Sequence, residues 1–228
     1  MDNYNDFANE YEAYGKNAVT DIEIGYKNVL KLLGEVKGKR ILDYGCGTAK
    51  FTRILKDRGA KVIGVDIAEK EIAIAKLKYP DLELYLADDI KNKMRSDFDA
   101  AVLNFVITAI PSKETILEIF KNIHNFLKPN GRLVMMNSNY EKSANREFLS
   151  FAIGEIKPKT GAALKVSLGI DRSLVIEDYF YSREDYSSML EQAGFVLEKI
   201  VEPLADDESH PWKDERKYPP FLIISAKK

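Results

Sequence analysis

The sequence predicts an α/β protein built on an open, mostly parallel sheet, and three observations carry this prediction. Apolar runs of strand length alternate with segments of helical spacing from residue 40 to residue 136. The run at residues 98–106 is nearly all apolar, which is typical of a strand buried on both faces of a parallel sheet. A turn containing Gly45 and Gly47 joins the first strand to a helix. This alternation indicates βαβ units with right-handed crossovers.

The first 36 residues precede the first expected strand and have a helical pattern. Apolar and aromatic residues recur at helical spacing over residues 6–33. Gly15 is expected to break this stretch into two helices, because glycine is unfavourable inside a helix. We expect residues 1–36 to form a helical cap that lies across the ligand-binding edge of the sheet.

Five strands and three helices follow in alternation. The expected strands cover residues 40–44, 61–66, 82–87, 98–106 and 132–136. The expected helices cover residues 49–58, 69–78 and 111–127. Pro80 stops the second of these helices and Pro111 opens the third.

The alternation breaks after the fifth strand. Residues 140–180 are too long for a simple connection, so we expect an insert with structure of its own. A short helix is expected over residues 147–153 and two strands over residues 164–168 and 174–179. A helix with Ser182 as its N-cap follows, and strands at 195–201 and 220–226 close the chain. We expect residues 1–228 to form a single domain.

Composition narrows the classes of partner and compartment. The chain has 34 Lys and Arg against 36 Asp and Glu, a net charge of −2, which supplies no general attraction to nucleic acid or an anionic membrane. The single cysteine allows no intramolecular disulfide. The polar, acidic N-terminus is unlike a signal peptide, and no apolar run reaches membrane-spanning length. We expect a cytoplasmic protein with neither nucleic acid nor membrane as a partner.

Three carboxylates lie at or just after the ends of the first three expected strands. They are Asp43, Asp66 and Asp88. A carboxylate that ends the second strand is well placed to accept from both hydroxyls of a ribose. The carboxylate after the third strand could accept from an exocyclic amine such as that of adenine. These positions predict a nucleoside-containing ligand with a polar tail at the glycine turn.

The glycine spacing separates two classes of nucleoside cofactor. A dinucleotide fingerprint needs G-x-G-x-x-G or its alanine variant, because the third small residue allows close packing of helix on strand. The third position here is Lys50, a bulky charged residue. This counts against an NAD-dependent dehydrogenase.

The stretch from Ile41 to Thr48 resembles motif I of the class I S-adenosylmethionine-dependent methyltransferases, whose core is D-x-G-x-G. Further matches to this family follow in order: Asp66 with Ile67, the segment Ala87-Asp88-Asp89, the strand that begins Phe98-Asp99, the stretch 126–133, and Ala193-Gly194-Phe195. One departure is Ala49, where many members have a third glycine; alanine is small enough for the turn to survive.

The resemblance implies a fold, a cofactor and a set of cofactor-binding residues. The fold would be a three-layer Rossmann-like methyltransferase fold with a seven-stranded sheet of order 3-2-1-4-5-7-6, the last-placed strand being antiparallel. The cofactor would be S-adenosyl-L-methionine, with S-adenosyl-L-homocysteine as product, and no metal is expected. Tyr11 would approach the methionine carboxylate. The residues implied are Tyr11, Asp43, Gly45, Cys46, Gly47, Asp66, Ile67, Asp88, Asp89 and Asn104.

The sequence gives less direct evidence about the acceptor of the methyl group than about the cofactor. Methyl transfer from a sulfonium is an in-line displacement, so positioning and water exclusion carry much of the rate. We expect an N or O atom of a small molecule as acceptor.

The stretch from Asn104 to Ile107 lacks the Pro-Pro pair found in enzymes that methylate exocyclic base amines, which argues against nucleic acid as the acceptor. A peptide or protein methyltransferase and a non-catalytic S-adenosylmethionine-binding protein are the alternatives. The oligomeric state, monomer or homodimer, is left open.

Candidate residues for the acceptor side are a histidine and several aromatic residues. His210 is the candidate base, although a plain surface loop is the simpler reading, and His124 is expected to pack or face solvent. The aromatic residues expected to line the acceptor site are Tyr4, Phe7, Tyr140, Tyr179, Tyr181 and Trp212. The equally weighted alternative for those of the insert and the final loop is that they pack the insert against the sheet.

Overall fold

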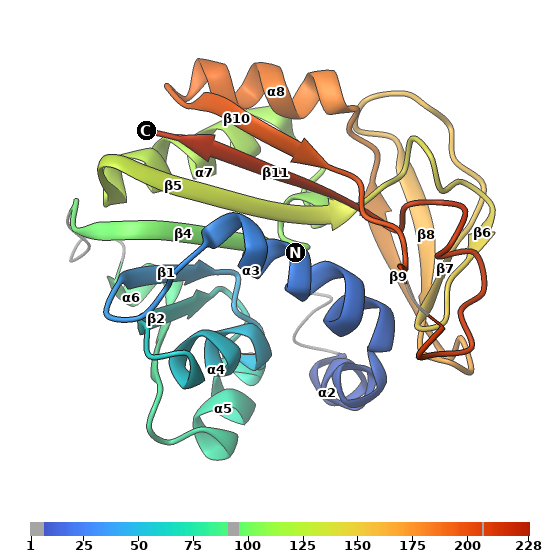
Figure 1. Cartoon of the computed structure of the whole chain (residues 1–228), viewed down its shortest axis with the longest axis horizontal. Helices are drawn as coiled ribbons and strands as arrows, with labels where there is room; N and C mark the ends of the chain where they lie inside the picture. Colours follow the sequence, from blue (N-terminus) through green and yellow to red (C-terminus); the bar gives the residue numbers. More distant parts are fainter. Residues whose placement is uncertain (1–6, 91–95, 207) are drawn as a thin grey trace.

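The structure, a computed structural model, describes residues 7–90, 96–206 and 208–228. Within them, a seven-stranded sheet has the order β10-β11-β5-β4-β1-β2-β3, and a separate four-stranded sheet has the order β6-β7-β8-β9 (Figure 1). Strands β3, β2, β1, β4 and β5 are parallel, and β11 is antiparallel to both β5 and β10. With β10 and β11 as the sixth and seventh strands, the predicted order 3-2-1-4-5-7-6 and its antiparallel last strand are confirmed.

The strands of the main sheet lie within a few residues of their predicted bounds. They are β1 (Arg40–Tyr44), β2 (Lys61–Asp66), β3 (Glu83–Leu86), β4 (Phe98–Asn104), β5 (Leu127–Ser138), β10 (Val196–Val201) and β11 (Phe221–Lys227). The strand β5 begins earlier than predicted, because the Lys-Pro-Asn-Gly turn is a bulge inside it, with Asn130 at φ 65°.

The helices flank this sheet on both faces, as the three-layer prediction requires. They are α2 (Ala8–Asn17), the π-helical turn η1 (Asp21–Tyr26), α3 (Lys27–Leu33), α4 (Lys50–Asp57), α5 (Glu69–Lys78), α6 (Ala87–Ile90), the short η2 (Ile107–Ala109), α7 (Lys113–Phe126) and α8 (Arg183–Gln192). Neighbouring residues of β1 point to opposite faces. Ile41 packs in the cluster with α3 and α4, and Leu42 in the cluster with α7 and α8. Ser182 caps α8 as predicted, in a capping box with Asp185.

The break in the N-terminal cap does not fall where the sequence predicted. Helix α2 runs through Gly15 to Asn17, and the chain leaves it at Ala18, with φ −77° and ψ 63°. Ala18 is buried, so packing of the cap onto the protein sets the bend, and the local cost of a glycine in a helix does not decide it. A different glycine, Gly25 of η1, is the one that matters for packing of the cap. A Cβ there would lie 2.6 Å from the Met136 sulfur, so this glycine allows the cap to lie close to β5.

The insert forms the four-stranded antiparallel sheet, with strands β6 (Arg146–Glu147), β7 (Phe151–Ile153), β8 (Ala163–Leu168) and β9 (Leu174–Tyr179). The two predicted strands are confirmed as β8 and β9, and the predicted helix over residues 147–153 is wrong. Residues 148–151 form a tight turn, in which the Phe148 amide donates to the Phe151 carbonyl at 2.8 Å. Both phenyl rings are buried. A turn and a helix place residues three apart on one side, which is why the pattern resembled a helix.

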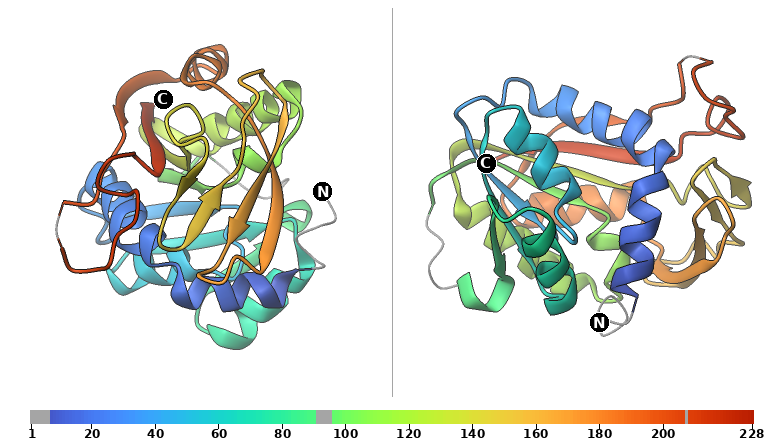
Figure 2. Two further views of the ribbon diagram at one scale, coloured as in Figure 1. Left: turned by 90° about the vertical axis from the view of Figure 1, so that its right-hand side faces the viewer. Right: turned by 90° about the horizontal axis from the view of Figure 1, so that it is seen from below.

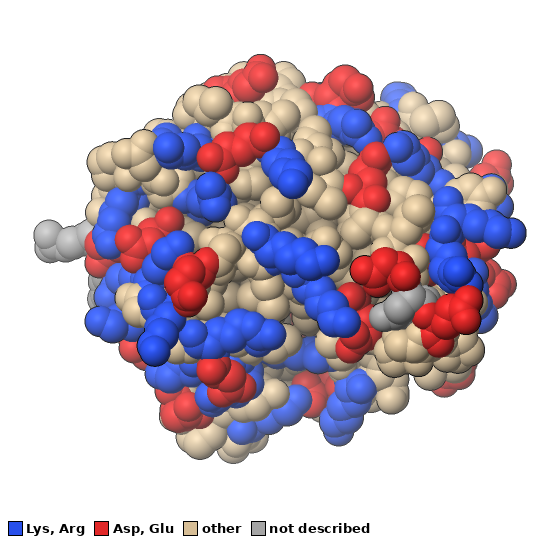
Figure 3. Space-filling model, viewed as in Figure 1, with Lys and Arg blue, Asp and Glu red and all other residues tan. Residues whose placement is uncertain are grey.

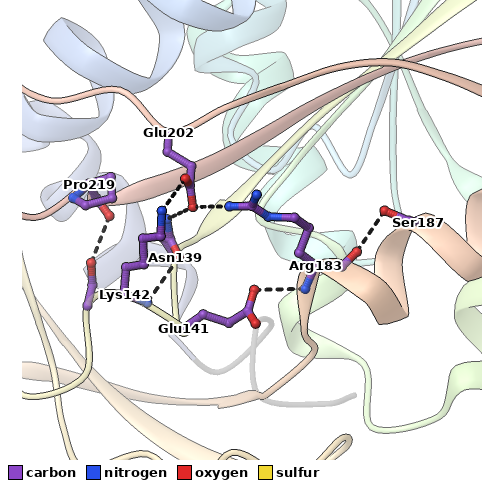
Figure 4. Close-up of polar contacts among 8 residues, drawn as sticks. Asn139, Glu141, Lys142, Arg183, Ser187, Glu202 and Pro219 are labelled. Atoms are coloured by element: carbon purple, nitrogen blue, oxygen red, sulfur yellow. Dashed lines mark hydrogen bonds and ion pairs between the residues drawn. The ribbon is translucent and has the colours of Figure 1, made fainter.

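Glu202 joins both ends of the insert to the segment after β10 (Figure 4). Its carboxylate accepts from the Asn139 amide at 3.0 Å and pairs with Lys142 at 2.6 Å, where the chain enters the insert. It also pairs with Arg183 at 2.6 Å, where the chain leaves the insert to begin α8. These partly exposed pairs are individually weak, but together they orient the insert relative to the main sheet.

Glu215 connects the N-terminal cap, the insert and the loop before β11. This side chain is fully buried, and its Oε1 accepts from the Thr20 hydroxyl at 2.9 Å and from the Leu149 amide. Its Oε2 accepts from the Lys213 amide at 2.8 Å. Two views show the cap helices and the insert side by side (Figure 2). The cap is therefore held against the insert by buried hydrogen bonds.

Replacing Glu215 by alanine is expected to lower the free energy of unfolding by about 2–4 kcal/mol, because the Thr20 hydroxyl and two backbone amides would lose their buried acceptor. Chemical denaturation measures this change. Glu208→Ala in the same loop is the matched control. Glu208 is 83% exposed as a side chain, so its loss should cost less than about 0.5 kcal/mol. Equal effects of the two substitutions would contradict the role given to Glu215.

Candidate active site

The turn after β1 has a backbone that only glycine suits at two positions. Gly45 and Gly47 have φ values of 76° and 51°. A Cβ on Gly45 would lie 2.2 Å from a Val106 methyl, and one on Gly47 would lie 2.5 Å from a Glu71 carboxylate oxygen. The Gly45 amide donates to the Val65 carbonyl at 2.7 Å, which fastens the turn to the end of β2.

Asp66 holds the same turn from the other side. Its Oδ2 accepts from the Gly47 amide at 2.8 Å, and its Oδ1 accepts from the Ala68 amide at 2.9 Å, just before α5. The turn then enters α4 through Ala49, which has φ 63°. The predicted tolerance of alanine at this position is confirmed, although its left-handed backbone is the conformation that favours the family's usual glycine.

Asp43 lies at the base of this turn and is buried. Its Oδ2 accepts from the Thr52 hydroxyl at 2.6 Å, which ties the end of β1 to the first turns of α4. Burial, with a smaller contribution from the nearby Asp66 charge, raises the pKa of Asp43 to about 7, although the hydrogen bond from the Thr52 hydroxyl opposes the shift. The Asp43 carboxylate is therefore shielded from solvent by the fold.

A cavity of about 430 Å³ extends from this turn to the insert. Its walls come from the cap, the turn after β1, the ends of β2 and β4, and the inner face of the insert sheet. The insert contributes Phe151, Val166, Leu168, Ile176 and Asp178. Phe105, at the end of β4, lines it in a left-handed conformation with φ 61°, which is uncommon for a bulky residue and typical of functional sites.

The cavity is rich in buried carboxylates. Burial raises the pKa of Asp21 to about 7, of Glu71 to about 8 and of Asp178 to about 6. Lys50 is the one basic side chain among the described residues that line the cavity. Its ammonium donates to the Gly15 carbonyl, and burial lowers its pKa. The chain alone therefore leaves most of this negative charge without a cation.

The sequence reasoning missed two of these acids, Asp21 and Asp178, together with Tyr14, and it named Tyr140 only as an aromatic residue of the acceptor site. The Tyr14 hydroxyl donates to Asp21 at 2.8 Å, and the Tyr140 hydroxyl donates to Asp178. A usable signal existed in β9, where Leu174, Ile176 and Asp178 share one face. An acid at a core-facing position of a strand is rarely buried unless it is paired or functional.

The site contains features that fit an S-adenosylmethionine molecule. Both side-chain polar atoms of Asn104 are buried without a hydrogen-bond partner in the described structure, and Asn104 lines the cavity at the end of β4. The glycine turn leaves room that a Cβ would fill. The carboxylates suit a ligand that carries a sulfonium and an ammonium.

Most of the residues that the resemblance implied for the cofactor come together at this cavity. Those in its lining are Tyr11, Asp43, Gly45, Cys46, Gly47, Asp66, Ile67 and Asn104. Ile67 is 56% exposed and thus free to cover a flat ring. Asp88 and Asp89 lie in the short helix α6 with exposed side chains outside the lining, and the preceding Ala87 lines the cavity instead.

The aromatic residues expected around the acceptor are placed elsewhere. Tyr140 and Tyr181 are buried, and the Tyr181 hydroxyl donates to the Ile110 carbonyl at 2.8 Å. Tyr179 bonds to Glu177, Trp212 packs against the core, and Phe7 is outside the lining. Their positions correspond to the alternative, in which these rings pack the insert, because burying large aromatic surface is favourable. Tyr4 lies outside the described residues.

Neither histidine lines the cavity. His210 contacts Trp212, with ring centroids 4.9 Å apart, in the loop before β11, so its position lends no support to a role as base. His124 packs edge-on against Phe195, which is the first of the two placements expected for it, packing or facing solvent. Across the described parts of the chain, no group of three or more His, Cys, Asp or Glu side chains is arranged to hold a metal ion. None of the helices described there is long and apolar enough to cross a membrane.

Comparison with known proteins agrees with this geometry. A family model described as a methyltransferase domain matches residues 20–200. N-demethylindolmycin N-methyltransferase of Streptomyces griseus is 28% identical over 188 residues, which cover 75% of this chain and 76% of that protein. Demethylmenaquinone methyltransferase of Tropheryma whipplei is 26% identical over 170 residues, covering 72% and 70%.

The fold is likewise found among solved structures. An S-adenosylmethionine-dependent methyltransferase from Mesorhizobium loti superposes with a TM-score of 0.66 at 25% identity, covering 89% of this chain and 96% of that one. The family model spans well over half of the chain, and the strand order and the glycine turn agree with it. The chain therefore belongs to the methyltransferase-domain family and is a class I S-adenosylmethionine-dependent methyltransferase.

Proposed function

We propose that this methyltransferase acts on an N or O atom of a small-molecule acceptor bound between the glycine turn and the insert. The observation that carries the proposal is the single cavity whose lining includes Gly45 and Asp66 at one end and Phe151, Ile176 and Asp178 at the other. A donor at the turn and an acceptor against the insert would share this space, which in-line transfer requires.

The donor end uses the residues nearest the turn. Asp66 is proposed to accept from the ribose hydroxyls and Ile67 to cover the adenine, with Asn104 supplying unpaired polar atoms to the polar tail. The sulfonium supplies an already activated methyl group. The chain then has to orient the acceptor and exclude water, and the apolar walls from the insert suit that task.

A small acceptor is favoured over a peptide by the way the cavity is covered. Residues 1–36 are proposed as a cap and residues 140–180 as a cover over the acceptor, and buried hydrogen bonds through Glu215 join the two. A peptide methyltransferase needs an open groove instead. The names of the relatives from Streptomyces griseus and Tropheryma whipplei describe small-molecule acceptors, which supports this choice.

The face of the molecule shown in Figure 3 gives no support to a nucleic-acid or membrane partner. On the face shown in Figure 3, lysine and arginine side chains alternate with aspartate and glutamate and form no extended patch of one sign. Mixed charge of this kind provides no strong attraction to a phosphate backbone or an anionic bilayer. We propose a cytoplasmic enzyme on this basis together with the composition.

Replacing Asp66 by alanine is expected to weaken binding of S-adenosylhomocysteine at least tenfold, about 1.4 kcal/mol, because the acceptor of the ribose hydroxyls and of the Gly47 amide is lost. Isothermal titration calorimetry measures the affinity. Asp57→Ala is the control, since Asp57 is an exposed residue of α4 that pairs with Arg53. Unchanged affinity in Asp66→Ala would show that the ribose assignment is wrong, and preferential binding of NAD would overturn the proposed donor.

Replacing Asp43 by asparagine is expected to stabilise the protein without its cofactor at pH 8, and most of this gain should be lost by pH 4. Folding raises the pKa of this carboxyl from 3.8 to about 7 by burial. The cost of the buried charge therefore grows as the pH rises above the unfolded pKa of 3.8, and above pH 7 it reaches its full value of about 4 kcal/mol. It falls to zero once the folded and unfolded forms are both protonated.

Urea unfolding of both proteins at pH 4, 6 and 8, without cofactor, gives the difference in unfolding free energy. Thr52→Val serves as a control, because it removes the hydroxyl that bonds Asp43 while leaving the charge in place. It should lower stability most at pH 8. A difference between Asp43→Asn and the wild type that stays constant with pH would contradict the shifted carboxyl.

A further inference from the structure

A second buried carboxylate lies at the insert end of the cavity, away from the glycine turn. Asp178 of β9 is 4% exposed and lines the cavity beside Ile176 and Val166. The Tyr140 hydroxyl donates to its Oδ2. Its Oδ1 is buried and has no hydrogen-bond partner in the described structure. The Thr108 hydroxyl is close enough to influence Asp178, but it donates to the Phe105 carbonyl at 3.4 Å. The protein thus fixes Oδ2 and leaves Oδ1 for a ligand.

Among the described residues, only neutral groups compensate the Asp178 charge. The Tyr140 and Thr108 hydroxyls favour its ionised form, and its charge raises the pKa of the nearby Tyr186. No lysine, arginine or histidine is among the influences on its pKa. A buried carboxylate without a cation is costly, and proteins keep such groups where a ligand or a metal supplies the positive charge.

The cavity as a whole has the same imbalance. The one basic side chain among the described lining residues is Lys50 of α4, whose ammonium reaches the cap and donates to the Gly15 carbonyl. The acidic residues of the lining are Asp21, Asp43, Asp66, Glu71, Glu118 and Asp178. An acceptor carrying a phosphate or a carboxylate would meet repulsion here, whereas a cation would be attracted.

We infer that the acceptor is an amine, and that Asp178 binds it as an ammonium through Oδ1 while Phe151, Val166 and Ile176 hold its hydrocarbon part. This inference rests on the proposed function and gives the acceptor a chemical class and a binding residue. Tyr140 is a positioning residue in this arrangement, because it holds the other carboxylate oxygen.

The arrangement also provides for the proton that the acceptor must lose. An ammonium has no free lone pair, so one N–H bond must break before the nitrogen can attack. Asp178 accepts that proton. The lone pair then forms the N–C bond while the C–S bond of the donor breaks and its electrons remain on sulfur. The charge balances, because the sulfonium becomes a neutral thioether and the nitrogen becomes a methylated ammonium.

Calorimetry on the protein saturated with S-adenosylhomocysteine tests the inference with matched probes. The amine probes are 2-phenylethylamine, tryptamine and hexylamine, and the comparison probes are 2-phenylethanol and 3-phenylpropionate. We expect at least one amine to bind the wild type tenfold or more tightly than 2-phenylethanol, and 3-phenylpropionate to bind most weakly. This comparison requires no variant, so it remains decisive if a substitution prevents folding.

Asp178→Asn is expected to reduce the amine preference to less than threefold while S-adenosylhomocysteine affinity stays within threefold of the wild type. Glu177→Gln is the matched control. Glu177 is the neighbouring residue of β9, it is exposed and bonds to Tyr179, and its substitution removes the same charge. The preference should survive in this control. With any amine that is methylated, Asp178→Asn should lower kcat/KM at least tenfold.

The outcomes separate this inference from the proposed function. Absence of S-adenosylhomocysteine binding would overturn the proposed function and with it the inference. Binding of S-adenosylhomocysteine without an amine preference, or with a preference that Asp178→Asn leaves intact, would overturn the inference alone. Tighter binding of 2-phenylethanol than of every amine would do the same and would favour a hydroxyl acceptor.

Discussion

The hydrogen bonds that join the turn after β1 to the end of β2 are the constraint on which the site depends. The Gly45 amide bonds to the Val65 carbonyl and the Gly47 amide bonds to the Asp66 carboxylate. These bonds form only because β1 and β2 are parallel and adjacent, so that both strands end at the same edge of the sheet. The glycine turn after β1 leads the chain into α4, away from that edge. The geometry of the proposed donor site is thus a direct consequence of strand order.

The same edge concentrates acids that the fold does not neutralise. Asp43 and Asp178 lie at opposite ends of one cavity and both have a raised pKa because burial disfavours their charge. Keeping such groups costs stability, which proteins tolerate where a ligand relieves the cost. A cationic donor at one end and a cationic acceptor at the other would each do so. Stability of the chain and ligand binding are therefore opposed at these residues.

The main sheet was predictable because each of its elements has a periodicity that burial imposes locally. The run at residues 98–106 is apolar on both faces since α-helices cover both faces of β4. The errors in the predicted secondary structure arose where local sequence features fitted more than one backbone conformation. Phe148 and Phe151 are three apart in a turn as they would be in a helix, and Gly15 remains inside α2 because the bend follows the burial of Ala18.

The sequence alone predicted the proposed donor site, since Asp43, Gly45, Gly47 and Asp66 lie at strand ends that strand order must bring together. The acceptor side was decided by tertiary structure. Asp178 reaches the cavity only because the insert forms a separate sheet whose strand β9 packs against η2, and the spacing of residues along the chain does not predict that contact. The aromatic residues nearby pack the insert because their area is better buried there. The local pattern of apolar residues specifies the helices and strands, whereas the packing of those helices and strands decides which side chains come into contact.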